Sequence, residues 1–209
     1  MTHAGGSYDC RDTDAIRAMA ARERNAVVEC ANTLEANGCA APTVSVGSTP
    51  TATFADSFEG VTEVRVGVYM FQDLVMAGLG VCALDDIAIS VLGSVIGHQH
   101  DRHWLITDAG WMALSRDRGT ARQRVDQGYG VVCDEAGQPI EDLVVAAANQ
   151  EHGIVGRRGG GALDIARFPI GSLLRILPNH ACATAAQHTH YHVLRDGVQV
   201  AKWERVSGW

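Results

Sequence analysis

Seven short apolar segments that follow Asp86 place the tightest limit on the fold of this chain. Each is rich in branched or aromatic residues and is bounded by Gly, Asp or Asn, a pattern typical of β-strands joined by turns. No long helical period interrupts them. They span residues 87–96, 104–108, 128–132, 143–146, 172–177, 191–194 and 198–200. The sequence therefore predicts a mostly β part after a boundary near residues 72–85, and we assign it residues 81–209.

The residues before this boundary follow a different pattern. From Thr13 to Ala36, apolar residues recur at helical spacing and Asn37-Gly38 follow, which predicts one amphipathic helix. Residues 43–46 are β-branched and predict a strand, residues 47–51 predict a turn crowded with hydroxyl groups, and residues 61–71 predict a second strand. This order is one step of an α/β barrel or a doubly wound sheet.

The turn at residues 47–51 is a candidate anion site. Backbone N–H groups and hydroxyls at the end of a strand can donate to a phosphate. An ordinary loop is the alternative, and the residues alone leave both open.

Composition excludes several classes of partner. The 209 residues carry 24 acidic and 17 basic side chains, a formal net charge of −7, with no basic block. We therefore expect neither nucleic acid nor an anionic membrane as a partner. The first residues lack the features of a signal peptide and no apolar stretch has the length of a membrane span, so a cytoplasmic location is expected. The six cysteines form no CxxC pair and are expected to be reduced thiols.

His180 and Cys182 are the leading candidates for metal binding. In an extended strand, residues i and i+2 project from the same face, so both side chains can reach one point. Imidazole nitrogen and thiolate sulfur are donors that Zn²⁺ favours. The alternative is a buried cysteine beside a hydrogen-bonded core histidine, because free cysteine is among the most buried residue types. For a bare His-x-Cys pair, that alternative is favoured.

Other polar residues have weaker claims. Asp108 ends a predicted strand, where a turn is the simpler interpretation. Glu151 and His152 could act in proton transfer or support a metal ligand, but neighbouring residues of a strand face opposite ways. Two groups of closely spaced histidines are both expected on solvent-exposed surface: His98, His100 and His103, and His188, His190 and His192.

Five motifs stand in a characteristic order: Val44–Thr51, Thr62–Tyr69, Asp108–Gly110, Glu151–Gly153 and Pro178–Thr184. Together they resemble the D-serine dehydratase/D-threonine aldolase-like family of alanine racemase-like, fold-type III pyridoxal phosphate enzymes. The terminal Ser207-Gly208-Trp209 is similar to the family too.

The resemblance implies the C-terminal half of such an enzyme. Residues 1–80 would be the last βα units of a (β/α)₈ barrel, and residues 81–209 the β domain that follows it. These enzymes usually act as homodimers.

The resemblance also implies the cofactors and their residues. Pyridoxal phosphate would be bound from two strand ends, and Zn²⁺ or another divalent metal by the His-x-Cys pair. The implied cofactor-binding residues are Ser45, Gly47, Ser48, Thr49, Arg65, Gly67, Val68 and Tyr69, and the implied metal ligands are His180 and Cys182.

The implied activity is that of a lyase acting on D-3-hydroxy amino acids. Elimination of water would give an enamine, which decays by hydrolysis to a 2-oxo acid and ammonia. The aldolase branch of the family typically has Asp where this chain has Cys182. That position favours dehydration over retro-aldol cleavage.

One departure from the family limits this expectation. The chemistry needs a lysine amine near the cofactor, and the only lysine here is Lys202, seven residues from the end. The family's lysine lies upstream of anything present in this chain. We therefore expect a shortened gene product or one half of a split enzyme, inactive alone and completed by a separate N-terminal barrel half. A non-catalytic partner or binding module is the alternative.

Overall fold

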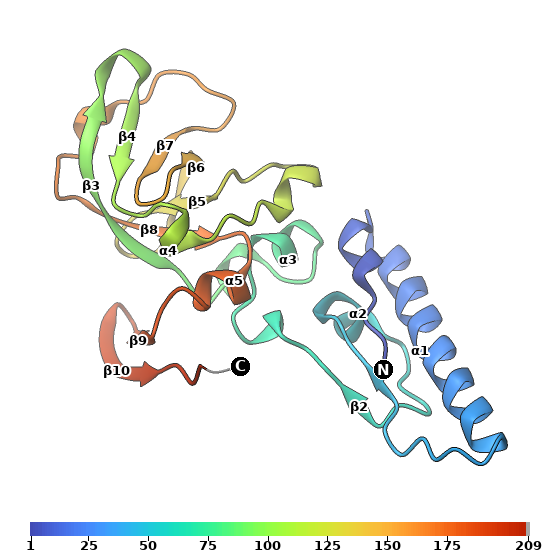
Figure 1. Ribbon diagram of the computed structural model, residues 1–209. Helices are drawn as coiled ribbons and strands as arrows, with labels where there is room; N and C mark the ends of the chain where they lie inside the picture. The colour runs from blue at the N-terminus through green and yellow to red at the C-terminus, as the bar shows by residue number, and fades with distance from the viewer. Residues whose placement is uncertain (208–209) are drawn as a thin grey trace.

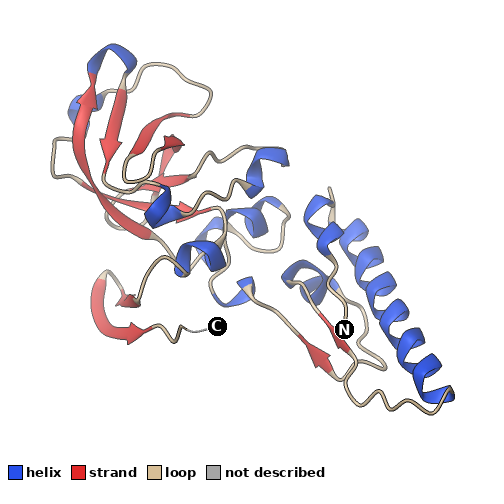
Figure 2. Ribbon diagram, in the orientation of Figure 1, coloured by secondary structure: helices blue, strands red, loops and turns tan. Residues whose placement is uncertain are grey.

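The structure is a computed structural model, and it describes residues 1–207. Gly208 and Trp209 of the terminal motif lie outside the described residues. The chain forms an N-terminal part built around one long helix and a larger part built around a β-barrel (Figures 1 and 2).

The β part is a closed barrel in which every neighbouring pair of strands is antiparallel. Its order is β3-β4-β7-β6-β5-β8, and β8 closes it by pairing with both β3 and β5. Closure removes free strand edges. The strands are β3 (Val91–Gln99), β4 (Trp104–Thr107), β5 (Gly130–Cys133), β6 (Pro139–Ala148), β7 (Gly153–Arg157) and β8 (Leu173–Pro178).

Alternation along these strands fills the barrel interior. Val95, Leu105, Val145, Val155 and Ile176 are fully buried and belong to one apolar cluster. The predicted β-rich character is thus confirmed. The expectation of a strand from residue 87 is wrong, since β3 begins at Val91. The strand β7 was not predicted, because glycines occupy two of its five positions.

A two-stranded hairpin follows the barrel and is not part of it. β9 (His190–Arg195) pairs antiparallel with β10 (Val198–Glu204). Tyr191 of β9 packs against Phe71, with ring centroids 5.3 Å apart. Both predicted strands are confirmed, and each is longer than the sequence indicated.

The N-terminal part is organised by α1 (Thr13–Ala36), whose predicted bounds are confirmed. Asp12 caps it by accepting a hydrogen bond from the Ala15 N–H at 2.8 Å, as N-cap carboxylates do. Its buried face packs against the segment that contains β1 (Ser45–Val46), through Val27, Ala31, Val44 and Val46.

β1 pairs in parallel with β2 (Glu63–Val64), and each strand has only two residues. The expectation of one strand over residues 61–71 is wrong, because the chain leaves the sheet after Val64 and forms a 3₁₀ turn, η2 (Val68–Met70). The turn predicted at 47–51 is partly helical, since Ser48 caps α2 (Thr49–Phe54). Among the described residues no (β/α)₈ barrel is present, and the parallel strand pairing there is limited to β1 and β2.

The remaining helices are short. They include η1 (Gly5–Asp9), α3 (Leu74–Gly78), η3 (Leu84–Asp86), η4 (His100–Arg102), α4 (Trp111–Leu114), η5 (Gly119–Arg122), η6 (Ile165–Arg167) and α5 (Ala181–Ala185). A second apolar cluster joins Ile16 of α1 to Leu74 and Met76 of α3 and to Val131 and Leu177 of the barrel. The N-terminal part and the barrel therefore share a core. Within residues 1–207, no helix has the length and apolar character needed to cross a membrane.

Replacing Ile176 tests the barrel core. This side chain is fully buried on β8, whereas Leu92, on neighbouring β3, is 55% exposed. We expect Ile176→Ala to lower the free energy of unfolding by about 2–5 kcal/mol, because the cavity is not refilled. Leu92→Ala should change it by about 0.5 kcal/mol or less. Urea unfolding followed by circular dichroism measures both, and equal losses would contradict the assigned interior.

Candidate active site

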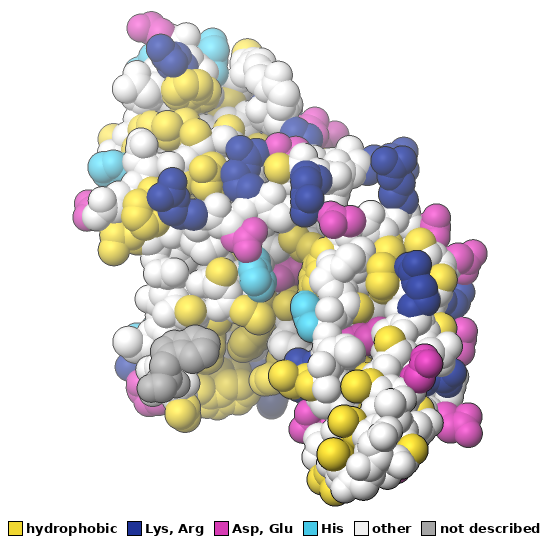
Figure 3. All heavy atoms as spheres, turned by 45° about the vertical axis from the view of Figure 1, so that its right-hand side comes forward, with side chains coloured by type: hydrophobic (Ala, Val, Ile, Leu, Met, Phe, Trp, Pro, Cys, Tyr) yellow, Lys and Arg dark blue, Asp and Glu magenta, His cyan; other side chains and the backbone are white. Residues whose placement is uncertain are grey.

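A cavity of about 1000 Å³ lies where the N-terminal part meets the elements around the barrel. In Figure 3, histidine and acidic side chains gather along the boundary between these two lobes. The cavity brings together eight of the residues singled out in the sequence: Ser48, Thr49, Arg65, Gly67, Val68, Tyr69, His180 and Cys182.

Ser45 and Gly47 lie behind the cavity wall. Ser45 is buried, and its hydroxyl bonds the Glu63 carboxylate and accepts from Arg65 Nε at 2.8 Å. A Cβ on Gly47 would lie 2.5 Å from the Arg65 carbonyl oxygen. Only glycine allows these two chain segments to approach so closely.

The backbone that brings His180 and Cys182 together differs from the predicted strand. The expectation that they lie on one extended strand is wrong, because β8 ends at Pro178 and α5 begins at Ala181. His180 has extended backbone angles at the N-cap position, and Cys182 lies in the first helical turn. The two side chains still line the same cavity, and Cys182 has the largest influence on the pKa of His180. Cys182 is exposed, so the buried-cysteine alternative does not describe it.

Asp73 fixes where α5 begins. Its carboxylate accepts hydrogen bonds from the Met76 N–H and from the Ala181 N–H, both at 2.9 Å. It therefore caps α3 and anchors the first turn of α5 together. Burial raises the pKa of Asp73, while its backbone N–H donors lower it. Asp73 also lines the cavity.

Asp117 holds the His180 ring. Its Oδ2 lies 2.7 Å from His180 Nδ1, and both side chains are about 40% exposed. This contact leaves His180 Nε2 as the nitrogen available to another group, since a carboxylate on one ring nitrogen orients the other.

The pKa of His180 reflects its neighbours. Its pKa is raised to about 9, because the neighbouring Cys182 side chain raises it most and the Asp117 carboxylate also raises it, while burial lowers it. The ring is therefore the cationic member of a chain that runs from Asp117 to Cys182. Burial also raises the pKa of Tyr8, which lines the same cavity, with Asp73 and Cys182 adding to the effect.

Asn179 places Asp117 near His180. It is 2% exposed, and its side chain accepts from the Thr120 hydroxyl at 2.6 Å and donates to the Gly128 carbonyl at 2.7 Å. Because Asn179 directly precedes His180, these bonds hold the loop that contains Asp117 against the end of β8.

A network of hydrogen bonds supports the wall of the cavity that the N-terminal part forms, which contains Ser48 and Thr49. Glu23 of α1 is 8% exposed, and it accepts from the Gly47 N–H at 3.0 Å and from the Thr51 hydroxyl at 3.0 Å. The Ser48 hydroxyl lies 2.7 Å from that of Thr51. Among residues 1–207, the buried hydroxyl of Thr49 has no hydrogen-bond partner. A buried hydroxyl beside a cavity without a partner fits an oxygen-rich ligand group, because such a group is costly to leave unpaired.

The fit to the implied cofactors is uneven. The hydroxyls of Ser48 and Thr49 and the guanidinium of Arg65 suit a phosphate, and His180 with Cys182 suits zinc. Among residues 1–207, no set of three or more His, Cys, Asp or Glu side chains is arranged to hold a metal. The lysine of pyridoxal phosphate chemistry is not supplied, because Lys202 lies on β10, paired with Glu204 at 3.5 Å.

Four further cavity residues with a phenol, carboxyl or guanidinium group were not identified from the sequence: Tyr8, Asp73, Asp117 and Arg122. Asp73 has a recognisable signal, since Asp before an apolar segment is a common N-cap. The other three come from segments without a motif, and only folding brings them to the cavity.

The remaining sequence candidates lie elsewhere. Asp108 ties β4 to β3 by accepting from the Ser94 N–H and hydroxyl, both at 2.7 Å. Glu151 and His152 are exposed in the turn between β6 and β7. His98 was expected in solvent, but it is partly buried, with Nε2 2.7 Å from the Phe168 carbonyl oxygen.

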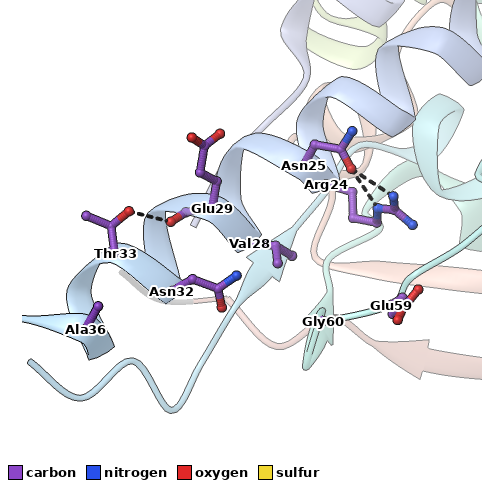
Figure 4. A pocket seen from close by; sticks show the side chains of 9 residues that line it. All are labelled: Arg24, Asn25, Val28, Glu29, Asn32, Thr33, Ala36, Glu59 and Gly60. Carbon is purple, nitrogen blue, oxygen red and sulfur yellow. Dashed lines mark hydrogen bonds between the residues drawn. The ribbon is translucent and has the colours of Figure 1, made fainter.

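A second hollow, of about 680 Å³, runs along the outer face of α1 (Figure 4). The guanidinium of Arg24 donates to Asn25 Oδ1 at 2.8 and 3.2 Å, and the Thr33 hydroxyl donates to the Glu29 carbonyl at 2.8 Å. These bonds join neighbours on one helix and do not converge on a ligand position. We assign no chemistry to this groove.

The titration of His180 tests the Asp117–His180–Cys182 chain. In protein freed of metal by EDTA, we expect a pKa of about 9 against the ordinary 6.5. Protonation of His180 then stabilises the fold below about pH 6.5, and this contribution is lost as the pH rises through about 9. NMR titration measures the pKa, with His180→Ala to assign the signal. Asp117→Asn and Cys182→Ala should each lower it, and an unchanged value in both would contradict the contacts.

Several known proteins are similar to this chain in sequence. The domain family described as "Putative serine dehydratase domain" matches residues 88–194. D-threo-3-hydroxyaspartate dehydratase from Delftia sp. (strain HT23) is 57% identical over 100% of this chain and 56% of its own length. D-serine dehydratase from Dictyostelium discoideum is 33% identical over 95% of this chain and 51% of its own length.

A solved structure is similar over the whole chain as well. It is a cysteine-to-alanine mutant of D-threo-3-hydroxyaspartate dehydratase in the metal-free form, with a TM-score of 0.94 and 56% identity over 100% of this chain and 55% of that one. The chain thus spans about half the length of the relatives it matches.

Proposed function

This chain belongs to the serine dehydratase domain family, and from that membership we propose that it forms the C-terminal half of a dehydratase acting on D-3-hydroxy amino acids. The reaction removes water from the substrate to give an enamine, and hydrolysis of that enamine through its imine tautomer consumes one water, releases ammonia and leaves a 2-oxo acid. The two named relatives, a D-threo-3-hydroxyaspartate dehydratase and a D-serine dehydratase, support this reaction over retro-aldol cleavage.

The observation that carries the proposal is the convergence of two donor sets on one cavity. Ser48 and Thr49 reach it from the N-terminal part, and His180 and Cys182 reach it from the end of β8. The first set suits a phosphate and the second suits a soft divalent metal. A substrate lying between them would contact both.

His180 and Cys182 are proposed to hold a zinc ion, or another divalent metal, through Nε2 and Sγ. Bound there, such an ion supplies Lewis-acid chemistry for a leaving hydroxyl. Asp117 orients His180 through Nδ1. A structure of the related dehydratase is described as a cysteine-to-alanine mutant in the metal-free form, which supports a metal role for a cysteine of that enzyme.

The cofactor assignment rests on the cavity wall that contains Ser48 and Thr49. Ser48 and Thr49 are proposed to bind the phosphate of pyridoxal phosphate together with the backbone amides of Gly67 and Val68. Arg65 and Tyr69 would lie next to the cofactor, and Ser45 and Gly47 would support this wall from behind. The cofactor supplies an electron sink for a carbanion. The absent Cβ of Gly67 leaves room next to Cys182, since an added Cβ would lie 3.7 Å from its Sγ.

The reactive lysine is proposed to come from outside these residues. Residues 1–80 are proposed to be the last units of a (β/α)₈ barrel that an N-terminal half completes, and residues 81–209 the β domain. The completed enzyme is proposed to be a cytoplasmic homodimer. The very short β1–β2 sheet supports this proposal, because a parallel pair of two-residue strands normally belongs to a larger sheet.

The metal assignment is tested by zinc content. His180→Ala and Cys182→Ala should each lose about one equivalent of zinc relative to the wild type, because each removes one of two protein ligands. Cys30→Ala is the matched control, since Cys30 is an exposed cysteine on α1. Elemental analysis after dialysis gives the contents. Equal zinc in all four proteins would remove the assignment.

The lysine argument is tested by activity. The isolated chain, mixed with pyridoxal phosphate, zinc and D-serine, should release no pyruvate and should not retain cofactor after borohydride reduction, since no lysine lines the cavity. The Delftia relative, assayed in parallel with D-threo-3-hydroxyaspartate, shows that the conditions support dehydration. Release of pyruvate by the isolated chain would overturn the proposal of a missing half.

A further inference from the structure

Two histidines of β9 remain outside the site described above. His190 and His192 alternate with Tyr191 along the strand. Tyr191 packs inward on Phe71, at a centroid distance of 5.3 Å, so His190 and His192 share the opposite, outward face. His188 does not join them, because it precedes the strand and its Nε2 lies 2.9 Å from the Ala113 carbonyl oxygen.

The two imidazoles lie with their Nε2 atoms next to each other. Their Nε2 atoms are 3.2 Å apart, and the ring planes are inclined at 75°. Two nitrogen ligands held 2.0–2.1 Å from a tetrahedral ion lie about 3.3–3.4 Å apart. The observed separation is therefore close to the spacing that one shared ion requires.

The far side of each ring is already held. His192 Nδ1 lies 3.1 Å from Gln199 Oε1, and His190 Nδ1 lies 3.1 Å from the Thr189 hydroxyl. Hydrogen bonds of this kind to the second ring nitrogen orient metal-binding histidines. Among the hydrogen bonds within residues 1–207, neither Nε2 atom has a partner other than the Nε2 of the neighbouring ring.

The charges on this face are balanced. In the β9–β10 register Glu204 is opposite His190 and Lys202 is opposite His192. The ammonium and carboxylate are 3.5 Å apart, so the carboxylate offsets the charge that would otherwise repel a cation. Since residues 1–207 supply no third protein ligand, water completes the coordination.

We propose that His190 and His192 form a second metal site, a His-x-His chelate on the β9–β10 hairpin that binds a late first-row divalent ion such as Zn²⁺ or Ni²⁺. Imidazole is a preferred ligand of these ions. The site is separate from the His180/Cys182 pair and does not depend on its assignment.

The test uses the full chain without a polyhistidine tag, titrated with Ni²⁺ and with Zn²⁺ by calorimetry at about pH 7.5, where free imidazole is mostly neutral. In the background His180→Ala/Cys182→Ala, one ion should still bind. Adding His192→Gln or His190→Gln should weaken that binding at least tenfold. Adding His152→Gln, an exposed histidine of the β6–β7 turn, should leave it unchanged.

NMR provides a second readout that does not need the double variant to fold. In the otherwise unaltered chain, metal should shift or broaden the ring signals of His190 and His192, and His192→Gln should lower the binding stoichiometry by one. A background variant that folds but binds no metal, or equal binding with and without His190 and His192, would show that the rings only hydrogen-bond each other. Loss of metal from His180/Cys182 alone would contradict the proposed function and leave this site standing.

Discussion

A single buried carboxylate, that of Asp73, determines how the helices α3 and α5 meet. It is 1% exposed and accepts from the N–H groups of Met76 and Ala181, which lie more than a hundred positions apart in sequence. Each bond satisfies an N–H group at the start of a helix. Without this carboxylate both donors would be buried and unpaired, at a cost of about 1–3 kcal/mol each. The start of α5, and so the placement of Cys182, depends on it.

The barrel contributes to the site through one strand. β8 is hydrogen-bonded to β3 on one side and to β5 on the other, and one residue, Asn179, separates its last residue from His180. Asn179 then fastens the loop that contains Asp117. The result is a histidine whose position is set by a closed sheet and whose ring orientation is set by a carboxylate from a separate loop.

The parts of the fold that depend on local sequence patterns could be predicted well. The contacts between segments that are distant in sequence could not. The helix at residues 13–36 and the β-rich remainder follow from apolar spacing, turn residues and caps, which act over a few positions. Barrel closure was not predictable, because strand pairing over long separations leaves no periodic trace. The sequence also predicts eight of the residues that line the cavity, on both of its walls, since the motifs carry them. Tyr8, Asp117 and Arg122 carry no local signal, and the helical turn at Cys182 depends on an acceptor from Asp73.

The two walls of the cavity differ in how their backbones are supported. The His180 wall continues from a strand with hydrogen-bonded neighbours on both sides, whereas the Ser48 wall follows a sheet of two-residue strands. Free energies of local opening rise with the number of protected backbone bonds that must break together. Amide hydrogens around β1 and β2 therefore exchange with solvent from smaller openings than those of β8. The cavity is bordered by one rigid wall and one wall that opens first.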